Sequence, residues 1–320
     1  MTLFKRSLIN LLHLGMLLCA VSAHAAYPLV IEHGQGSLTL EQAPTRVAVF
    51  DLGVLDTLDA LGIAAAGVPQ MAGPAYLKAK YEGRKTVNVG TLFEPDQAAL
   101  ERLKPDLIII GGRSSNQFEA LSALVPTIDL SIAPDHFLAG VQGNLKVLGE
   151  IFDKQAQAAQ LQAQLDKELA AVHAKTTGQS SLTLFTVNDA LMLHAPGERY
   201  GMLNEVLGTR SVVESVDPAS VAQGRPAPDS PEARQLRERQ KVRLEAALKE
   251  QPQWLVILDR GAATGGEGKA DETLGKHAGI ATSKAWADGT VFYLDPATWY
   301  IATGGYQGLI STLKAFAAAQ

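Results

Sequence analysis

Short apolar runs rich in β-branched residues alternate along the chain with segments whose apolar residues recur at helical spacing. The first kind predicts buried strands and the second predicts helices at residues 54–61 and 96–103. The alternation is typical of βαβ units and parallel sheets, and so of the α/β class. The expected strands are residues 47–50, 107–110, 127–130, 182–187, 255–258 and 291–294.

The middle of the chain has a different pattern. Residues 141–175 contain no Pro and no β-branched cluster, and their apolar positions form a stripe, which predicts one long helix, bent near Gly149. A polar turn follows it. We therefore predict two Rossmann-like lobes, residues 26–140 and 177–320, joined by one long backbone helix at 141–176.

The two halves share a short pattern. Residues 105–113 and 252–260 both begin with Pro, continue through a buried strand and end with Arg at the same offset, so we interpret them as a structural repeat. Residues 217–243 depart from the alternation of strand and helix patterns, because four prolines precede a charged run. They predict a loop followed by an exposed helix at 232–243.

The first 25 residues are typical of an export signal. Lys5 and Arg6 precede an apolar run, and Ala23-His24-Ala25 offers a signal-peptidase site. An uncleaved anchor is the alternative, although the run is short for a membrane span. Lipoprotein processing at Cys19 would need a small residue before it, where Leu18 stands. We expect export to the periplasm as a soluble protein, not a lipoprotein.

Export would leave a cysteine-free chain of about 295 residues, since Cys19 is the only cysteine. That chain excludes a disulfide, a thiolate metal site and a cysteine nucleophile. Loss of Lys5 and Arg6 changes the formal net charge from −5 to −7. Such an acidic surface argues against nucleic acid or an anionic membrane as partner. An anionic ligand would need locally concentrated positive charge.

Three arginines are candidates for that charge. Arg113 and Arg260 each follow a buried strand, and ligands of open α/β sheets bind beyond the carboxyl ends of strands. Arg199 lies in the turn at residues 197–201. A guanidinium group pairs with adjacent oxygen atoms and stacks on aromatic rings. The alternative for each is an ordinary surface salt bridge.

An aromatic loop at residues 294–305 follows the last predicted strand. Trp299 and Tyr300 there are candidates for a pocket wall, and the Tyr300 phenolate is a hard oxygen donor suited to ferric iron. Packing of both rings against the sheet remains the alternative.

Patterns of catalytic residues are sparse. The histidines beyond residue 25 are scattered and none has metal-ligand spacing with another ligand. The glycines at 34 and 36 lack the third glycine of a dinucleotide site, and no Gly-x-Ser-x-Gly elbow is present. We expect no enzyme activity; a periplasmic hydrolase is the alternative, and would need a triad or metal site.

The chain resembles the periplasmic ferric-siderophore-binding proteins of the single-helix-hinge type (class III), in the catecholate branch that binds enterobactin- and anguibactin-type ligands. The resemblance covers residues 27–316. It rests on the motifs at residues 43–47, 89–96, 103–108, 111–113, 197–201, 259–260 and 294–296.

The resemblance implies a substrate-binding component of an ABC transporter that delivers a ferric catecholate siderophore to an inner-membrane permease. It implies a monomer without a resident cofactor, in which Arg113, Arg199 and Arg260 surround the ligand and Tyr300 can bind iron. Relatives pair that tyrosine with a histidine in a variable loop, but residues 214–243 here contain none. This favours a siderophore that saturates the metal, or Tyr300 alone. Cobalamin, haem or another chelate are alternative ligands.

Acidic residues on both lobes are expected to dock on the permease. Glu94 and Glu101 in the first lobe and Glu245 in the second precede the repeated strands, on predicted helices. Ordinary solvated helix charges are the alternative.

Overall fold

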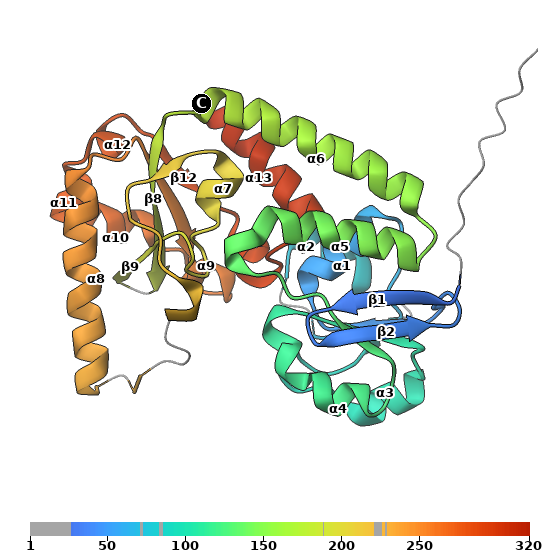
Figure 1. The fold of residues 1–320 in the computed structure, drawn as a ribbon. Coiled ribbons are helices and arrows are strands. Elements are labelled where there is room, and N and C mark those ends of the chain that lie inside the picture. The colour runs from blue at the N-terminus through green and yellow to red at the C-terminus, as the bar shows by residue number, and fades with distance from the viewer. Residues whose placement is uncertain (1–26, 71–72, 83–85, 188, 221–225, 228) are drawn as a thin grey trace, which may run out of the picture.

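The computed structural model describes residues 27–70, 73–82, 86–187, 189–220, 226–227 and 229–320, which form two α/β lobes (Figure 1). The predicted export signal lies outside these residues. Within them, no helix is long and apolar enough to cross a membrane.

The first lobe contains a parallel five-stranded sheet in the order β5-β4-β3-β6-β7. All four side chains of the interior strand β6 are buried, because helices cover both faces of the sheet, and this explains its unbroken apolar run. The strands are β3 (Val47–Val49), β4 (Gly67–Val68), β5 (Val87–Asn88), β6 (Leu107–Ile110) and β7 (Thr127–Asp129). The helices are α1 (Leu52–Ala60), α2 (Ala75–Tyr81), α3 (Gln97–Leu103), α4 (Phe118–Ser122) and the short η1 (Gly112–Gln117) and η2 (Pro134–His136).

An antiparallel hairpin precedes this sheet and packs beside β7. It consists of β1 (Leu29–His33) and β2 (Gly36–Leu40), with His33 opposite Gly36. Gly34 and Gln35 are therefore a two-residue hairpin loop, which explains the glycines at this position.

The second lobe contains the parallel order β10-β8-β11-β12, and β9 pairs antiparallel with β8. The strands are β8 (Ser180–Val187), β9 (Ala190–His194), β10 (Arg210–Ser211), β11 (Trp254–Asp259) and β12 (Val291–Tyr293). The helices are α7 (Leu203–Leu207), α8 (Pro231–Lys249), α9 (Arg260–Ala263), α10 (Ala270–Lys276), α11 (Ala278–Ala281), α12 (Lys284–Ala287), and the short η3 (Pro218–Ser220) and η4 (Ala297–Ile301).

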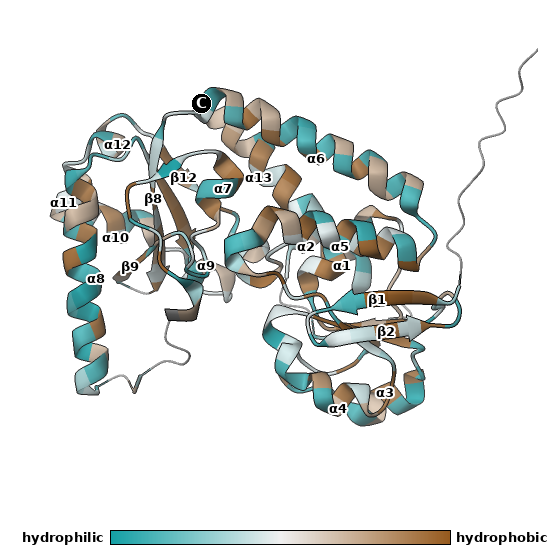
Figure 2. Ribbon diagram, in the orientation of Figure 1, coloured by the Kyte–Doolittle hydropathy of each residue, from teal (hydrophilic) through white to brown (hydrophobic). Residues whose placement is uncertain are grey.

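The predicted elements are largely confirmed. Each of the six predicted strands corresponds to an observed strand with ends within two residues, and the predicted helices at 54–61 and 96–103 are α1 and α3. The charged run at 232–243 lies in α8, which is mostly hydrophilic (Figure 2).

The single helix predicted at 141–176 is wrong, because the chain reverses within it. α5 (Phe137–Ile151) and α6 (Gln155–Thr176) are separate helices that pack against each other, and Asp153 between them adopts a left-handed conformation with φ of 54°. Gly149 does not bend a helix. A Cβ there would lie 2.7 Å from that of Ala158, so glycine allows α5 and α6 to approach closely. The helix that joins the lobes is α6.

A second connection between the lobes is made by the last helix, α13 (Tyr306–Ala319), which packs against α6, against α1 of the first lobe and against α7 of the second. The buried carboxylate of Asp56 in α1 accepts hydrogen bonds from the backbone N–H of Gln307 (2.6 Å) and Gly308 (3.2 Å), and also from the hydroxyl of Tyr76. A helix N-terminus attracts negative charge, so Asp56 anchors α13 to the first lobe. Residues 306–319 therefore contact both lobes.

Burial nevertheless raises the pKa of Asp56 to about 6, although these hydrogen bonds oppose the shift. A carboxyl group whose pKa is higher in the folded state binds protons more tightly there, so the wild-type protein should lose stability as the pH rises from about 4 through about 6. Asp56→Asn removes this dependence. We expect the free energy of unfolding of Asp56→Asn, relative to that of wild type, to rise by about 2–3 kcal/mol between about pH 4 and about pH 6.

Urea unfolding of both proteins at several pH values checks this expectation. Asp135→Asn changes an exposed carboxylate and serves as the control. A stability difference between Asp56→Asn and wild type that is constant with pH would contradict the raised pKa.

Candidate ligand-binding site

The loop after β6 fixes the position of Arg113 in the first lobe. The Ser114 hydroxyl donates to the carbonyl oxygen of Phe50 (2.9 Å), and the backbone N–H of Gly112 donates to the Ser131 hydroxyl (2.8 Å). Gly112 has a φ of 47°, a conformation that glycine adopts without strain. The backbone that carries Arg113 is therefore held from both sides, at the carboxyl end of β6.

Tyr300 brings two of the three predicted arginines together. The guanidinium carbon of Arg113 lies 4.4 Å from the centre of the Tyr300 ring, and a guanidinium N–H of Arg113 donates to the Tyr300 carbonyl oxygen. From the second lobe, Arg260 Nε donates to the Tyr300 hydroxyl oxygen at 3.1 Å. Arg260 begins α9, directly after β11. The matched strand–loop–arginine pattern of the two halves thus converges on one side chain.

The surroundings of Tyr300 favour its ionised form. Partial burial opposes ionisation, but the hydrogen bond from Arg260 and the charges of Arg113 and Arg260 outweigh it, so the pKa of Tyr300 lies below its ordinary value of 10.0. Tyr300 belongs to η4, a short π-helix, and such turns are frequent at functional sites. The two arginines therefore make the Tyr300 hydroxyl easier to deprotonate than a free phenol.

A tight turn presents Arg199 from the second lobe. Gly197 in this turn has a φ of 91°, and a Cβ there would lie 2.0 Å from the carbonyl oxygen of Val216, so only glycine fits. The carboxylate of Glu198 accepts from the backbone N–H of Ala195 (2.7 Å) and from Arg243 (3.0 Å). The anchored turn leaves the Arg199 side chain exposed.

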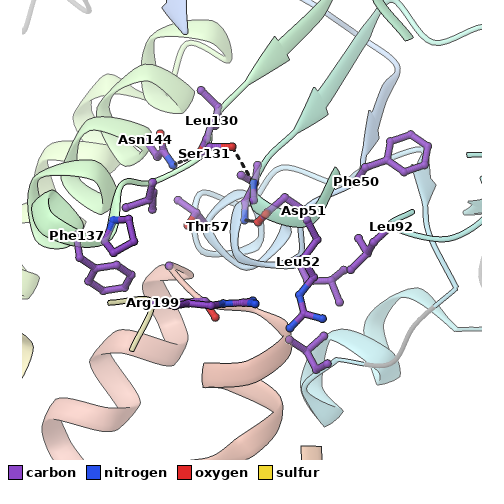
Figure 3. A pocket seen from close by; sticks show the side chains of 18 of the residues that line it. Phe50, Asp51, Leu52, Thr57, Leu92, Leu130, Ser131, Phe137, Asn144 and Arg199 are labelled. Carbon is purple, nitrogen blue, oxygen red and sulfur yellow. Dashed lines mark hydrogen bonds between the residues drawn. The ribbon is translucent and has the colours of Figure 1, made fainter. Parts of the chain in front are cut away.

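A cavity of about 320 Å³ lies between the lobes. Figure 3 shows Arg199 beside Phe137 and Thr57 of the first lobe, and Arg113 lines the same cavity. The Asp51 carboxylate also lines it and caps α1, and burial raises the pKa of that group. Within the described part of the chain, Arg113, Arg199 and Arg260 form no ion pair with a carboxylate. Their charges remain available to an anion.

Comparison with known proteins identifies the family. A sequence profile described as Periplasmic binding protein matches residues 47–298. The chain belongs to this periplasmic binding protein family. It is 31% identical over 275 residues to the petrobactin-binding protein YclQ of Bacillus subtilis, which covers 85% of this chain and 81% of YclQ. It is 29% identical to the ferric-anguibactin-binding protein FatB of Vibrio anguillarum, over 88% of this chain and 84% of FatB.

Solved structures agree with the fold. The crystal structure of YclQ matches with a TM-score of 0.76 and 27% identity, over 91% of this chain and 98% of YclQ. The catecholate-siderophore-binding protein VctP of Vibrio cholerae matches with a TM-score of 0.73 and 28% identity, over 90% of this chain and 99% of VctP. The two-lobed α/β prediction is confirmed. As a periplasmic binding protein, the chain is a transport component and not an enzyme, so the hydrolase alternative is set aside.

The structure contradicts the assignment of Trp299 to the ligand site of this periplasmic binding protein. The Trp299 side chain is only 2% exposed, and its indole N–H donates to the Thr312 hydroxyl at 2.8 Å. It packs on Phe137, with ring centres 5.9 Å apart. Its neighbour Tyr300 contacts Arg113 and Arg260 instead, so packing explains Trp299.

The aromatic support behind Tyr300 was not predicted. Phe185 of β8 stacks on Tyr300 at 5.9 Å and on Tyr200 at 5.2 Å between ring centres. Phe185 was assigned to a strand, but its orientation toward η4 depends on tertiary packing, and the sequence carries no separate signal for it. The three rings form a column that keeps Tyr300 between Arg113 and Arg260.

His194 is held away from the cavity between the lobes and does not replace the missing loop histidine there. The ring of His194 is buried against the edges of Phe185 and Tyr200, and burial lowers its pKa to about 4, so the ring is neutral. Among the described residues, no three His, Cys, Asp or Glu side chains are grouped to hold a metal ion. Tyr300 remains the residue of this site best suited to ferric iron.

The three glutamates proposed for docking are all exposed. Glu101 lies on α3 and Glu245 on α8, as expected. Glu94 is not on a helix: it lies in the turn before α3, where its backbone N–H donates to the Thr91 hydroxyl (2.9 Å). The position of Glu94 on a helix is therefore wrong, while its role in docking stays a prediction.

Proposed function

We propose that this periplasmic binding protein captures a ferric catecholate siderophore in the periplasm and delivers it to an inner-membrane ABC permease. The observation that carries the proposal is the convergence of Arg113 and Arg260 on Tyr300, beside a cavity that Arg199 enters. The proposed form is a soluble monomer released by signal-peptide cleavage, without a resident cofactor.

The charge of the ligand suits this site. Ferric iron wrapped by three catecholates carries roughly −3 net charge, which three arginines could offset in a partly desolvated cleft. Guanidinium groups also stack on aromatic rings, as Arg113 does on Tyr300, and catechol rings offer the same surface. The similar proteins YclQ, FatB and VctP are named for binding petrobactin, ferric anguibactin and a catecholate siderophore, which supports the same ligand class.

Titration of the purified protein tests the ligand class. We expect ferric catecholates to quench tryptophan fluorescence saturably and to give a broad visible charge-transfer band in the bound fraction. Haem would instead give a sharp Soret band, and cobalamin its own spectrum. Saturable binding of haem or cobalamin, with no response to any ferric catecholate, would overturn the proposed ligand.

Tyr300→Phe tests whether the protein binds iron directly. With a hexadentate siderophore, all six iron positions are filled, so we expect an unchanged spectrum and a loss of about 1 kcal/mol for one hydrogen bond. With a tetradentate siderophore, a phenolate–iron bond would shift the spectrum and make the loss clearly larger. The absence of a histidine in residues 214–243 favours a hexadentate natural ligand. A natural siderophore whose spectrum shifts with the Phe variant would contradict that preference.

A further inference from the structure

A second cavity lies within the second lobe, enclosed by α8, β9 and α10, with a volume of about 770 Å³. It is more than twice the size of the cavity between the lobes. Much of its lining is aliphatic. The apolar side chains that line it include Val187, Leu191, Met192, Ala233, Leu236 and Leu244.

The charges around this cavity are mainly positive. Arg237, Lys241, Arg260 and Lys276 line it, against the single carboxylate of Asp189. Lys276 is paired with Glu272 at 2.5 Å. Lys241 and Arg260, by contrast, take part in no ion pair that the described ranges contain. Such a cavity suits a molecule with two parts: an apolar part that contacts the apolar side chains and a negatively charged part that contacts the basic ones.

One tyrosine connects this cavity with the cavity between the lobes. Arg260 lines the second cavity and donates to the Tyr300 hydroxyl at 3.1 Å. Arg113 lines the first cavity and stacks on the same ring at 4.4 Å. A ligand bound at these arginines therefore lies within one side-chain length of the second cavity.

We propose that the cavity under α8 binds an apolar arm of the same ligand whose anionic ferric chelate lies at Arg113, Arg199 and Arg260. This inference rests on the proposed function and narrows it to chelates that carry an aliphatic or aromatic extension. Leu236 fits such a role, because it is a large apolar side chain, 36% exposed, that lines the cavity from a mostly hydrophilic helix (Figure 2). An arm laid over Leu236 and Met192 would remove apolar surface from water.

Two synthetic ligands test this inference. One is a hexadentate ferric tris-catecholate, and the other is the same chelate with an octyl chain on its backbone. We expect the wild-type protein to bind the octyl complex about tenfold or more tightly, because each buried methylene group contributes roughly a factor of four. Fluorescence titration gives both dissociation constants.

Variants on α8 locate the arm. Leu236→Glu and Lys241→Glu change residues that line the cavity. We expect Leu236→Glu to remove the preference for the octyl complex. We expect Lys241→Glu to weaken binding of the octyl complex several-fold. Val242→Glu and Arg239→Glu make matching changes on the same helix at positions outside the cavity lining. These two controls should keep the preference. Thermal unfolding verifies that all four variants are folded.

The possible results separate the two claims. Tight and equal binding of both complexes by wild type would overturn the arm site and leave the ferric catecholate assignment intact. No binding of either complex would overturn both. An octyl preference that Leu236→Glu and Val242→Glu reduce equally would place the chain elsewhere on the protein and would also overturn the arm site.

Discussion

Replacement of Arg113, Arg199 or Arg260 by alanine is expected to weaken ferric catecholate binding by about 1.5–3 kcal/mol, the range for hydrogen bonds to charged groups. This corresponds to roughly a tenfold to hundredfold higher Kd. Lysine should restore only part of the loss, because it lacks the planar fork of the guanidinium group. Arg102→Ala, at an exposed position on α3, is the control and should bind normally.

The three arginine variants should differ in a second measurement. Arg260 and Arg113 both lower the pKa of Tyr300, whereas Arg199 is not among the causes of that shift. Titration of tyrosinate absorbance in the ligand-free protein should therefore give a higher Tyr300 pKa in Arg260→Ala and Arg113→Ala, and an unchanged one in Arg199→Ala. Wild-type ligand affinity in all three variants would remove them from the binding site.

Charge reversal at the docking residues should have the largest effect on transport. Glu94→Arg, Glu101→Arg and Glu245→Arg each replace an exposed carboxylate that would face basic residues of the permease. We expect combined reversal at Glu94 and Glu245 to abolish siderophore uptake by iron-starved cells while ligand affinity stays at the wild-type value. Exposed ion pairs contribute little singly, so the single variants should lose less.

Asp166→Arg provides the matched control for the uptake assay. Asp166 is an exposed carboxylate on α6, which lies on the opposite side of the molecule from α3 (Figure 1). Its reversal should leave uptake unchanged. If the Glu94 and Glu245 double variant transported normally, these residues would not belong to the docking surface.

Elements buried on both faces were the most predictable from the sequence. β6 and β11 each have a neighbouring strand on both sides and are buried on both faces, so their runs are continuously apolar. The arginine after each strand therefore lies at the carboxyl edge of its sheet. The meeting of Arg113 and Arg260 on Tyr300 follows from this topology. The β1–β2 hairpin was missed because its strands are partly exposed and lack a continuous apolar run.

Features that depend on a single backbone angle or on packing could not be predicted. The reversal between α5 and α6 occurs at Asp153 without a glycine or proline, in a conformation that an L-residue adopts only at a cost. Likewise, the sequence offers two adjacent aromatic residues after β12. The π-helical turn directs Tyr300 to the arginines and Trp299 to the core, and no periodicity distinguishes them beforehand.

The anchoring of α13 on Asp56 affects how empty and loaded molecules of the protein would compete for the permease. Because both α6 and α13 tie the lobes together, we expect ligand entry to change the spacing of the proposed docking residues Glu94 and Glu245 only slightly. An empty protein would then compete with a loaded one for the same permease. Uptake would be fastest at an intermediate abundance of the binding protein, and overproduction in the absence of siderophore would act as an inhibitor.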